Sequence, residues 1–251
     1  MRLFAIGDLH LPGGDDKPMD VFGDHWEGHF DRISQDWHAR VTDEDVVLIP
    51  GDTSWAMQLK AAVPDLQAIG ALPGRKILIK GNHDYWWGGI GLVRKALPEG
   101  MQAIQHDTVD LGDCVVCGTR GWAYPNQETP LSQEDERIFN REMIRLELAL
   151  QSAVKLAEGR PIVVMLHYPP LYQQDRNTPF TQLLEKYPVH TVVYGHLHGA
   201  GIRAGFNGTW NGVRYQLASC DSLGFALAEI NLKNEDVTEF LHFSKSFDLK
   251  I

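Results

Sequence analysis

The chain has 251 residues, of which 43% are hydrophobic and 22% are charged. This length and composition are typical of a folded domain with a sizeable core and exclude an intrinsically disordered chain. The formal net charge is −10 and no run of lysine and arginine occurs, which argues against binding of long DNA or RNA. No apolar stretch approaches the roughly eighteen residues of a membrane span, and the N-terminus does not resemble a signal peptide. We therefore expect a cytoplasmic protein with no membrane contact.

Short apolar runs alternate with helical patterns over the first 200 residues. Continuous apolar runs, typical of buried strands, occur at residues 3–7, 46–51, 76–81, 161–166 and 191–195. Between them, apolar residues at helical spacing predict helices over 26–40, 64–72 and 133–158, with Pro64 in the first turn of the second. This alternation predicts an α/β architecture with a largely buried sheet.

The clearest helix signal lies over residues 133–158. Ser132 is a suitable N-cap, and the first turn is acidic, with Glu134, Asp135 and Glu136. The apolar stripe steps by four and three residues, through Phe139, Met143, Leu146, Leu150, Ala153 and Ala157. Three arginines step by four along the same helix: Arg137, Arg141 and Arg145. We interpret them either as a solvated face paired with neighbouring acids or as a cationic wall that selects an anionic substrate.

The cysteines are Cys114, Cys117 and Cys220, an odd and small number that fits a reducing compartment. The first two form CVVC, a spacing that redox and zinc sites also use. The sequence around them is typical of a strand, in which residues three apart point to opposite faces. We therefore expect buried cysteines that pack as small apolar side chains.

The last fifty residues have a different pattern. Asn-Gly pairs at 207–208 and 211–212 predict two tight turns between strands. Further strand-like runs follow at 225–232 and 237–243, so we expect an antiparallel second sheet packed on the first. No repeat or linker interrupts the chain, which predicts a single domain over residues 1–251.

Polar residues follow the ends of the five apolar runs. The blocks are Asp8-x-His10, Gly51-Asp52, Gly81-Asn82-His83-Asp84, His167 and Gly195-His196-x-His198. Ligands of open α/β sheets bind beyond the carboxyl ends of the strands, so we expect these side chains at one edge. Oxygen and imidazole ligands in this number suit two ions about 3.5–4 Å apart that share a carboxylate.

In this order, the five blocks resemble the calcineurin-like metallophosphoesterase superfamily, including its bacterial phosphohydrolases, over residues 8–198. The resemblance implies a four-layer αββα sandwich of two mixed β-sheets flanked by helices. It also implies two divalent metal ions, with manganese as the first expectation and iron or zinc as alternatives. The first ion would be held by Asp8, His10, Asp52 and His198, and the second by Asp52, Asn82, His167 and His196.

The resemblance further implies the roles in catalysis. A hydroxide that bridges the two metals would attack the phosphate ester. His83 would be the general acid for the leaving oxygen, and Asp84 would orient His83 and support its protonated form. Read without the resemblance, Asp84 could instead cap a turn, and His167 could be an ordinary loop residue.

Three residues near these blocks are candidates for substrate binding. Trp86 and Trp87 follow Asp84 and could stack on a nucleobase, or they could belong to the core. Arg120 could contact a phosphate with its guanidinium group, or it could pair with a nearby acid.

The function predicted from the sequence is hydrolysis of a phosphate ester by a dinuclear metallophosphoesterase. A small-molecule or nucleotide-like phosphodiester is slightly favoured, with phosphomonoesterase and protein phosphatase as alternatives. A non-catalytic metal-binding scaffold is disfavoured by the complete set of blocks. A metal-dependent hydrolase of carbon–nitrogen or carboxylic ester bonds is disfavoured because H-E-x-x-H and G-x-S-x-G motifs are absent. The sequence carries no signal for an oligomeric state.

Overall fold

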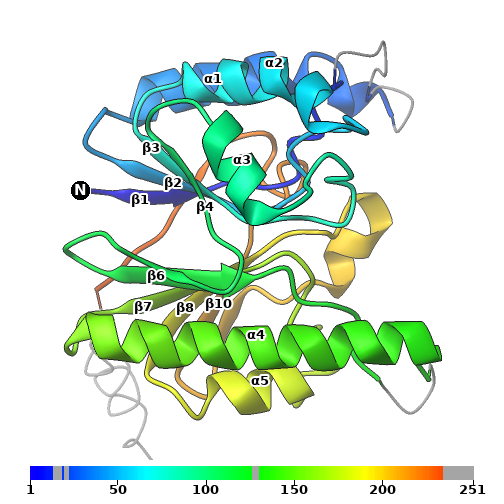
Figure 1. Ribbon diagram of the computed structural model, residues 1–251, viewed down its shortest axis with the longest axis vertical. Helices are drawn as coiled ribbons and strands as arrows, with labels where there is room; N and C mark the ends of the chain where they lie inside the picture. Colours follow the sequence, from blue (N-terminus) through cyan, green and yellow to red (C-terminus); the bar gives the residue numbers. More distant parts are fainter. Residues whose placement is uncertain (14–18, 20–22, 126–129, 234–251) are drawn as a thin grey trace, which may run out of the picture.

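The computed structural model describes residues 1–13, 19, 23–125 and 130–233. In this part of the chain two β-sheets lie face to face, and helices cover the outer face of each sheet (Figure 1). Both sheets are mixed, with parallel strands in the middle and antiparallel strands at edges. The α/β class and the four-layer αββα arrangement expected from the sequence are therefore confirmed.

The first sheet has the strand order β11-β1-β2-β3-β4. Strands β1 to β4 run parallel to their neighbours, and β11 pairs antiparallel with β1. Their bounds are Leu3–Ala5 (β1), Val46–Ile49 (β2), Arg75–Leu78 (β3), Met101–Ala103 (β4) and Ala228–Glu229 (β11).

The second sheet has the strand order β5-β6-β7-β8-β10-β9. Strands β6, β7, β8 and β10 are parallel, while β5 and β9 form antiparallel edges. Their bounds are Thr108–Asp110 (β5), Val115–Thr119 (β6), Ile162–Leu166 (β7), Val189–Tyr194 (β8), Gly208–Trp210 (β9) and Val213–Leu217 (β10).

The C-terminal strands differ from the expected antiparallel sheet. Asn211 and Gly212, both with positive φ, form the predicted tight turn between β9 and β10. Asn207-Gly208 does not form a second turn, because Gly208 opens β9 and Asn207 Oδ1 accepts a hydrogen bond from the Leu217 amide. The hairpin extends the second sheet, since β10 lies parallel to β8. The strand expected over 237–243 lies outside the described residues.

Helices α1, α2 and α3 cover the first sheet, and α4 and α5 cover the second (Figure 1). Their bounds are His29–Arg40 (α1), Leu59–Gly70 (α2), Ile90–Ala96 (α3), Gln133–Ala157 (α4) and Pro179–Leu184 (α5); short 3-10 turns occur at Asp24–Trp26 (η2) and Gly199–Ala204 (η3). Helix α4 starts as predicted, with the Ser132 hydroxyl accepting from the Asp135 amide.

Two predicted helix starts are displaced in the structure. The helix expected from residue 26 begins at His29, because Gly28 adopts a left-handed conformation with φ of 57° and separates η2 from α1. The helix expected from Pro64 already begins at Leu59. Its first turn is formed by the Gln58 carbonyl, which accepts from the amides of Ala61 and Ala62. Pro64 therefore lies inside α2.

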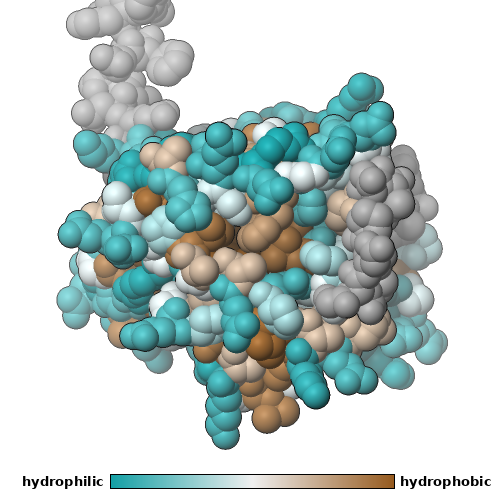
Figure 2. Space-filling model, turned by 90° about the horizontal axis from the view of Figure 1, so that it is seen from above, coloured by the Kyte–Doolittle hydropathy of each residue, from teal (hydrophilic) through white to brown (hydrophobic). Residues whose placement is uncertain are grey.

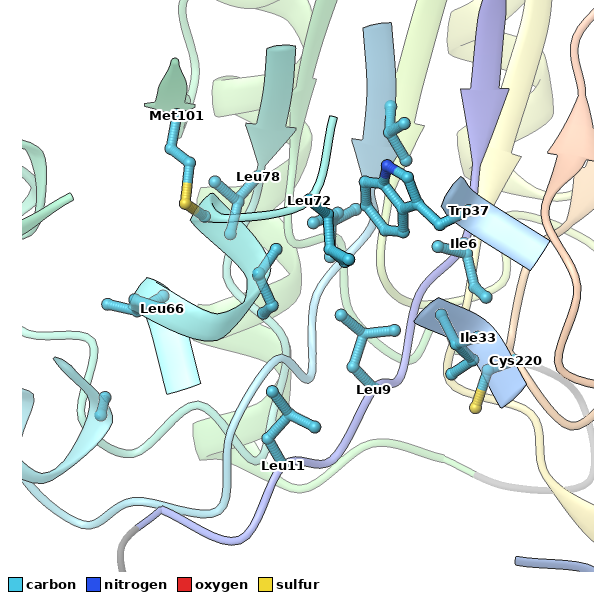
Figure 3. Close-up of a cluster of buried hydrophobic side chains, with 14 of the residues drawn as sticks. Ile6, Leu9, Leu11, Ile33, Trp37, Leu66, Leu72, Leu78, Met101 and Cys220 are labelled. Carbon is cyan, nitrogen blue, oxygen red and sulfur yellow. The ribbon is translucent and has the colours of Figure 1, made fainter. Parts of the chain in front are cut away.

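Three clusters of buried apolar side chains fill the spaces between the layers. One lies between the first sheet and its helices; Figure 3 shows part of it, including Ile33 and Trp37 of α1. The second lies between the second sheet and α4 and α5, and the third lies between the two sheets. Cys117 of β6 belongs to the second cluster and Cys114, which directly precedes β6, to the third, so the two thiols point to opposite faces of the sheet as expected.

Seen from the side of α1 and α2, the surface is mostly hydrophilic, with apolar residues gathered near the centre of this face (Figure 2). Among the described residues, no helix combines the length and the apolar character that a membrane span requires.

Candidate metal centre

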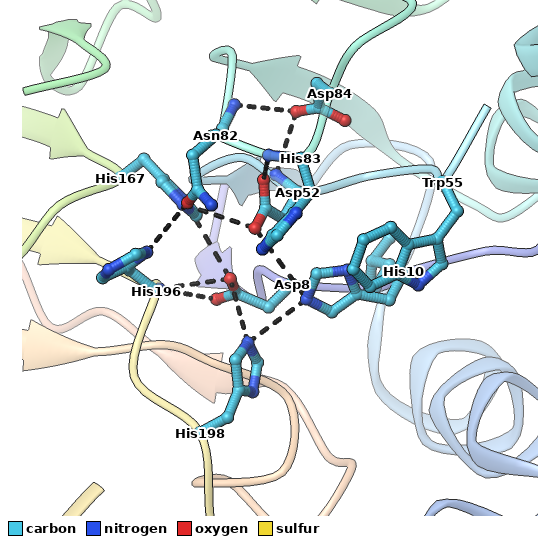
Figure 4. Close-up of polar contacts among 12 residues, drawn as sticks. Asp8, His10, Asp52, Trp55, Asn82, His83, Asp84, His167, His196 and His198 are labelled. Carbon is cyan, nitrogen blue, oxygen red and sulfur yellow. Dashed lines mark hydrogen bonds and ion pairs between the residues drawn. The ribbon is translucent and has the colours of Figure 1, made fainter. Parts of the chain in front are cut away.

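The carboxyl ends of the strands of both sheets meet at one edge of the sandwich. The Asp8 amide donates to the carbonyl of Gly51, and the Gly195 amide donates to the carbonyl of His167, so neighbouring strand exits are joined within each sheet. The two sheets are linked directly as well, because the His196 amide donates to both carboxylate oxygens of Asp8, at 3.1 and 3.0 Å. The blocks expected to supply ligands are therefore brought together (Figure 4).

One group of potential ligands consists of Asp8, His10 and His198. His198 Nε2 lies 3.3 Å from Asp8 Oδ1 and 3.2 Å from His10 Nε2. Two imidazole nitrogens that face each other beside a carboxylate oxygen are a donor set suited to a divalent cation.

A second group consists of Asp8, Asp52 and His167. His167 Nδ1 donates to the carbonyl of Pro50 at 2.9 Å, which leaves Nε2 as the ligand atom, 3.4 Å from Asp52 Oδ2. Asn82 and His196 extend this group, because Asn82 Oδ1 lies 2.6 Å from His167 Nε2 and 2.8 Å from His196 Nδ1.

Asp52 also reaches the first group. Its Oδ2 lies 3.8 Å from His10 Nε2, while its Oδ1 accepts from the His83 amide at 2.8 Å. Asp8 is common to both groups, so two carboxylates connect them. All seven side chains expected to hold metal thus converge, and the two groups together are compatible with a dinuclear centre.

Burial changes the pKa values of several of these side chains. Burial lowers the pKa of His10 and of His196 to about 3, so both rings are neutral and have a free lone pair. Burial raises the pKa of Asp52 to about 7, with the charges of Asp84 and Asp8 adding to this effect against the opposing influence of His167. A cation between these groups would compensate the buried carboxylates.

His198 differs from the other rings. Burial lowers its pKa, but hydrogen bonds to Asp221 and Asp8 outweigh burial and raise the pKa to about 10. A divalent ion at Nε2 would therefore replace a proton that the ion-free site holds there. In addition, His10 Nδ1 and His83 Nδ1 are buried without a hydrogen-bond partner among the described residues. The residues present fit a metal centre.

Four of the expected ligands have a strained backbone conformation. Seven non-glycine residues of the described chain have positive φ, and four of them are expected ligands: Asp8 (57°), His10 (46°), Asp52 (51°) and His196 (76°). Such conformations cost free energy for residues with a side chain and concentrate at active sites.

Two glycines of the motifs are needed for close approach. A Cβ atom at Gly81 would lie 2.0 Å from Asp52 Oδ1, and one at Gly195 would lie 2.4 Å from Asp8 Oδ2. Any side chain at these positions would displace the carboxylates, which explains why glycine precedes Asn82 and His196.

His83 lies beside the ligands without belonging to either group. Its ring packs against that of Trp55, with centroids 4.5 Å apart, and against that of His10 at 5.7 Å. Its side chain borders a cavity of about 300 Å³ that His10, Trp26, Trp55 and His198 also line. This position is suitable for a group that transfers a proton to a bound ester.

The hydrogen bonds of Asp84 join two loops of the site. Its buried carboxylate accepts hydrogen bonds from the amides of Asp52, Thr53, Ser54 and Gly81 and from the Trp86 indole. No described hydrogen bond joins it to the His83 ring, so Asp84 fixes the two loops that carry Asp52 and Asn82. These donors occupy both oxygens of Asp84, and the described contacts give no support for orientation of the His83 ring by a hydrogen bond. The charge of Asp84 raises the pKa of that ring against the larger effect of burial, so the expected support of its protonated form stays a prediction.

Trp86 and Trp87 do not line the site. Each is 2% exposed and belongs to the cluster between the first sheet and its helices. Both side chains therefore belong to the core, as the alternative expected, although Trp87 also borders the basic cavity that contains Lys80 and Arg120. A contact of either ring with a substrate stays a prediction. The aromatic residue at the site is instead Trp55, which stacks on His10 with centroids 4.7 Å apart. Its position three residues after the Gly51-Asp52 block is the sequence signal that identifies it.

Asp221 was also missed. Its Oδ1 accepts from His198 Nδ1 at 2.9 Å, and its Oδ2 accepts from the Gly199 amide at 3.0 Å. It lies shortly after β10, so the rule that polar residues at strand exits form the site would have found it.

Arg120 lies at the exit of β6, where its carbonyl accepts from the amides of His167 and Tyr168, both at 3.0 Å. Its guanidinium group stacks on Trp122 and borders a second cavity, together with Lys80, Arg141 and Arg145. Two of the three arginines of α4 thus form a basic surface with Arg120, while Arg137 is exposed and not part of this lining.

Comparison with protein-family models matches residues 1–200 to the calcineurin-like phosphoesterase family. A search of curated proteins by sequence found no match. Among solved structures, AQ665, a protein of unknown function from Aquifex aeolicus, aligns with a TM-score of 0.50 and 16% identity over 91% of this chain and 95% of that chain. Phosphopantetheinyl hydrolase (PptH) from Mycobacterium tuberculosis aligns with a TM-score of 0.57 and 15% identity over 92% and 96% of the two chains. At such identities the structures support the fold, whereas the family match covers all seven expected ligands. This chain therefore belongs to the calcineurin-like phosphoesterase family, which is a family of hydrolases.

Proposed function

We propose that this protein hydrolyses a small-molecule phosphodiester at a dinuclear metal centre. The observation that carries this proposal is the position of Asp52, whose Oδ2 lies 3.4 Å from His167 Nε2 and 3.8 Å from His10 Nε2. One buried carboxylate oxygen that reaches ligands of both groups is the arrangement that a bridging ligand requires.

Each ligand has a role in this proposal. Asp8, His10 and His198 hold one ion, while Asn82, His167 and His196 hold the other, and Asp52 contributes to both. When bound, the two ions supply Lewis acidity toward phosphate oxygens and an activated water. Manganese is the first candidate, with iron or zinc as alternatives, because all three accept carboxylate, amide and imidazole ligands.

His83 supplies the proton for the leaving oxygen. Burial lowers the pKa of its imidazole, followed by the charge of His167, whereas the charges of Asp84 and Asp8 oppose these effects. An anionic ester beside the ring would favour the protonated form, which is the form that donates.

The cavity beside His83 supports a small substrate. Trp26 and Trp55 give its wall a flat, largely apolar character, and His10 and His198 connect it to the metal ligands. An aromatic or planar leaving group fits such a wall by stacking, which favours a diester with an organic substituent on the leaving oxygen. A phosphomonoesterase or a protein phosphatase is the alternative that the following experiment separates.

Two further expectations stay predictions. Three free, buried cysteines support a location in the cytoplasm. The residues at the site support a phosphate ester as the substrate and give no role to a long nucleic acid.

The test is hydrolysis of bis(p-nitrophenyl) phosphate beside p-nitrophenyl phosphate by protein stripped of metal and then supplied with manganese, iron or zinc. We expect metal to restore turnover of the diester and His83→Ala to reduce kcat by about 10²–10⁴-fold while metal content is unchanged. His106→Ala is the matched control, because His106 is exposed and belongs to neither metal group.

Other outcomes would redirect or refute the proposal. Turnover of the monoester alone would make the protein a phosphatase. Two bound metals per chain without turnover of either ester would favour a binding scaffold. Equal losses in His83→Ala and His106→Ala would remove the catalytic role of His83.

A further inference from the structure

A cavity of about 200 Å³ lies between α4 and the loop that follows β3. Its lining includes four basic side chains, Lys80, Arg120, Arg141 and Arg145, and one carboxylate, that of Glu142. These residues come from three separate parts of the chain, so the cluster is a product of the fold. The lining carries three more positive than negative charges.

Glu142 forms hydrogen bonds with two of the arginines, Arg141 and Arg145. Its carboxylate is fully buried and accepts from Arg145 Nη1 at 2.7 Å, from Arg141 Nε at 3.4 Å and from the Thr119 hydroxyl. The side chains of Arg145 and Arg141 are 27% and 51% exposed, so both retain donors that point away from Glu142. Glu142 thus fixes two guanidinium groups at the cavity wall and leaves them able to bind another acceptor.

Lys80 and Arg120 have no carboxylate partner among the described residues. Lys80 Nζ donates to the carbonyl of Trp87 at 2.9 Å, and the Arg120 guanidinium stacks on Trp122 with 4.4 Å to the ring centroid. Burial lowers the pKa of the Arg120 guanidinium, the charge of Glu142 opposes this effect, and the charges of Arg141 and Arg145 add to it. Two half-buried cations that face like charges are costly unless an anion joins them.

We propose that this cavity binds a phosphoryl group other than the one that is hydrolysed. Guanidinium forks match the oxygens of a phosphate, and a surplus of three positive charges suits a dianion better than a single carboxylate. The cavity adjoins the metal centre through the backbone, because Arg120 accepts from the His167 amide and Lys80 lies two residues before Asn82. The phosphoryl group belongs either to a substrate with a second phosphate or to free phosphate.

The test counts inorganic phosphate sites by isothermal titration calorimetry on the metal-loaded protein. The double variant Lys80→Gln/Arg120→Gln keeps every metal ligand, so any phosphate bound at the metals is common to it and the wild type. We expect the double variant to lose one site, or to bind there at least about tenfold more weakly. Arg137→Gln on the exposed part of α4 is the matched control and should bind as the wild type does.

This comparison remains decisive if the proposed function is wrong. Without phosphate binding at the metals, the wild type would show one site and the double variant none. Equal numbers of sites and equal affinities in the two proteins would overturn the proposal. If the double variant is unfolded, Arg120→Lys keeps the charge but loses the fork, and the same comparison is made with it.

A second titration separates the two sources of the phosphoryl group. Adenosine 5′-diphosphate and adenosine 5′-monophosphate are compared as ligands of the wild type and the double variant. Tighter binding of the diphosphate, lost in the double variant, identifies a second phosphate of a substrate. Equal binding of both nucleotides, with the inorganic phosphate site present, identifies free phosphate as the ligand.

Discussion

Asp221 Oδ1 accepts a hydrogen bond from His198 Nδ1 at 2.9 Å, although the two residues are 23 positions apart. The bond fixes the imidazole so that Nε2 points toward Asp8 and His10, 3.3 and 3.2 Å away. The carboxylate thereby sets both the tautomer and the direction of the nitrogen that faces the metal site.

We predict that Asp221→Ala weakens metal binding by about 10–100-fold, because a ligand histidine that loses its carboxylate partner is less basic and less well oriented. The measurement is the metal affinity determined by competition with a chromophoric chelator. Asp221→Asn should retain part of the effect, since an amide oxygen still accepts from Nδ1. Unchanged affinity in Asp221→Ala would show that the bond does not support the metal site.

Substitutions at Asp84 and Trp86 should lower the free energy of unfolding by different amounts. In Asp84→Asn the amide group would face backbone N–H donors and break at least one buried hydrogen bond. We expect the free energy of unfolding to fall by about 2–4 kcal/mol and hydrolysis to fall with it. Trp86→Phe removes the indole donor to Asp84 Oδ1 and part of a buried ring, but it places no new donor against a backbone N–H, so the loss should be smaller, about 1–2 kcal/mol. Urea denaturation of both variants checks this order, and a larger loss in Trp86→Phe would contradict it.

Trp55 is expected to determine affinity for esters with an aromatic leaving group. Its ring stacks on His10 and borders the cavity next to His83. Trp55→Ala should raise KM for bis(p-nitrophenyl) phosphate about tenfold, because a stacking surface is lost. Trp55→Phe should retain most of the affinity. Steady-state kinetics decide the point, and a KM that is unchanged in the alanine variant would place the leaving group elsewhere.

Asp45 couples stability to pH at the start of β2. Burial alone would raise the pKa of its carboxyl group, but bonds from Arg2 and Thr42 outweigh burial and lower the pKa below its ordinary value. A lowered folded-state pKa contributes stability above the unfolded pKa, and this contribution disappears as the pH falls through the folded-state value.

We therefore expect Asp45→Asn to cost about 2 kcal/mol at pH 7, and the difference from the wild type to shrink as the pH falls below about 4. Urea denaturation at pH 7, 5 and 3 measures this difference. Glu44→Gln is the control, because Glu44 is exposed beside Asp45. A difference that is independent of pH would mean that the charge of Asp45 does not contribute.

The convergence of the expected metal ligands could be predicted, because the physics that brings them together is simple. Parallel strands that are buried on both faces read as continuous apolar runs, and their carboxyl ends meet at one edge. The proximity of Asp8 and His198, which are 190 positions apart, could therefore be predicted without knowing how the loops between them fold.

Features that depend on side-chain direction could not be predicted in this way. Asp84 follows His83 in the sequence, yet its carboxylate points to backbone amides and not to the His83 ring. Trp87, next to Trp86, is likewise buried in the core. Adjacent residues in a turn share no face, so proximity in the sequence is a poor guide to contact.

The sequence also could not predict which distant segments come together to form the basic cavity. Lys80, Arg120 and Arg145 belong to a loop, a strand exit and a helix, and no local pattern relates them. The same holds for the pairing of β10 with β8, because the Asn-Gly turn predicts a hairpin but not the sheet that the hairpin joins.

The backbone is left-handed at Asp8, His10, Asp52 and His196. This conformation lowers the stability of the fold at residues that are expected to be needed for catalysis. Glycine adopts these conformations without a steric penalty, so replacing an expected ligand by glycine can relieve strain while it removes a side chain that would bind metal. Selection for thermal stability alone would then favour variants in which glycine replaces these side chains. A library screened only for solubility or melting temperature would enrich inactive chains, and directed evolution of this enzyme needs an activity screen at every round.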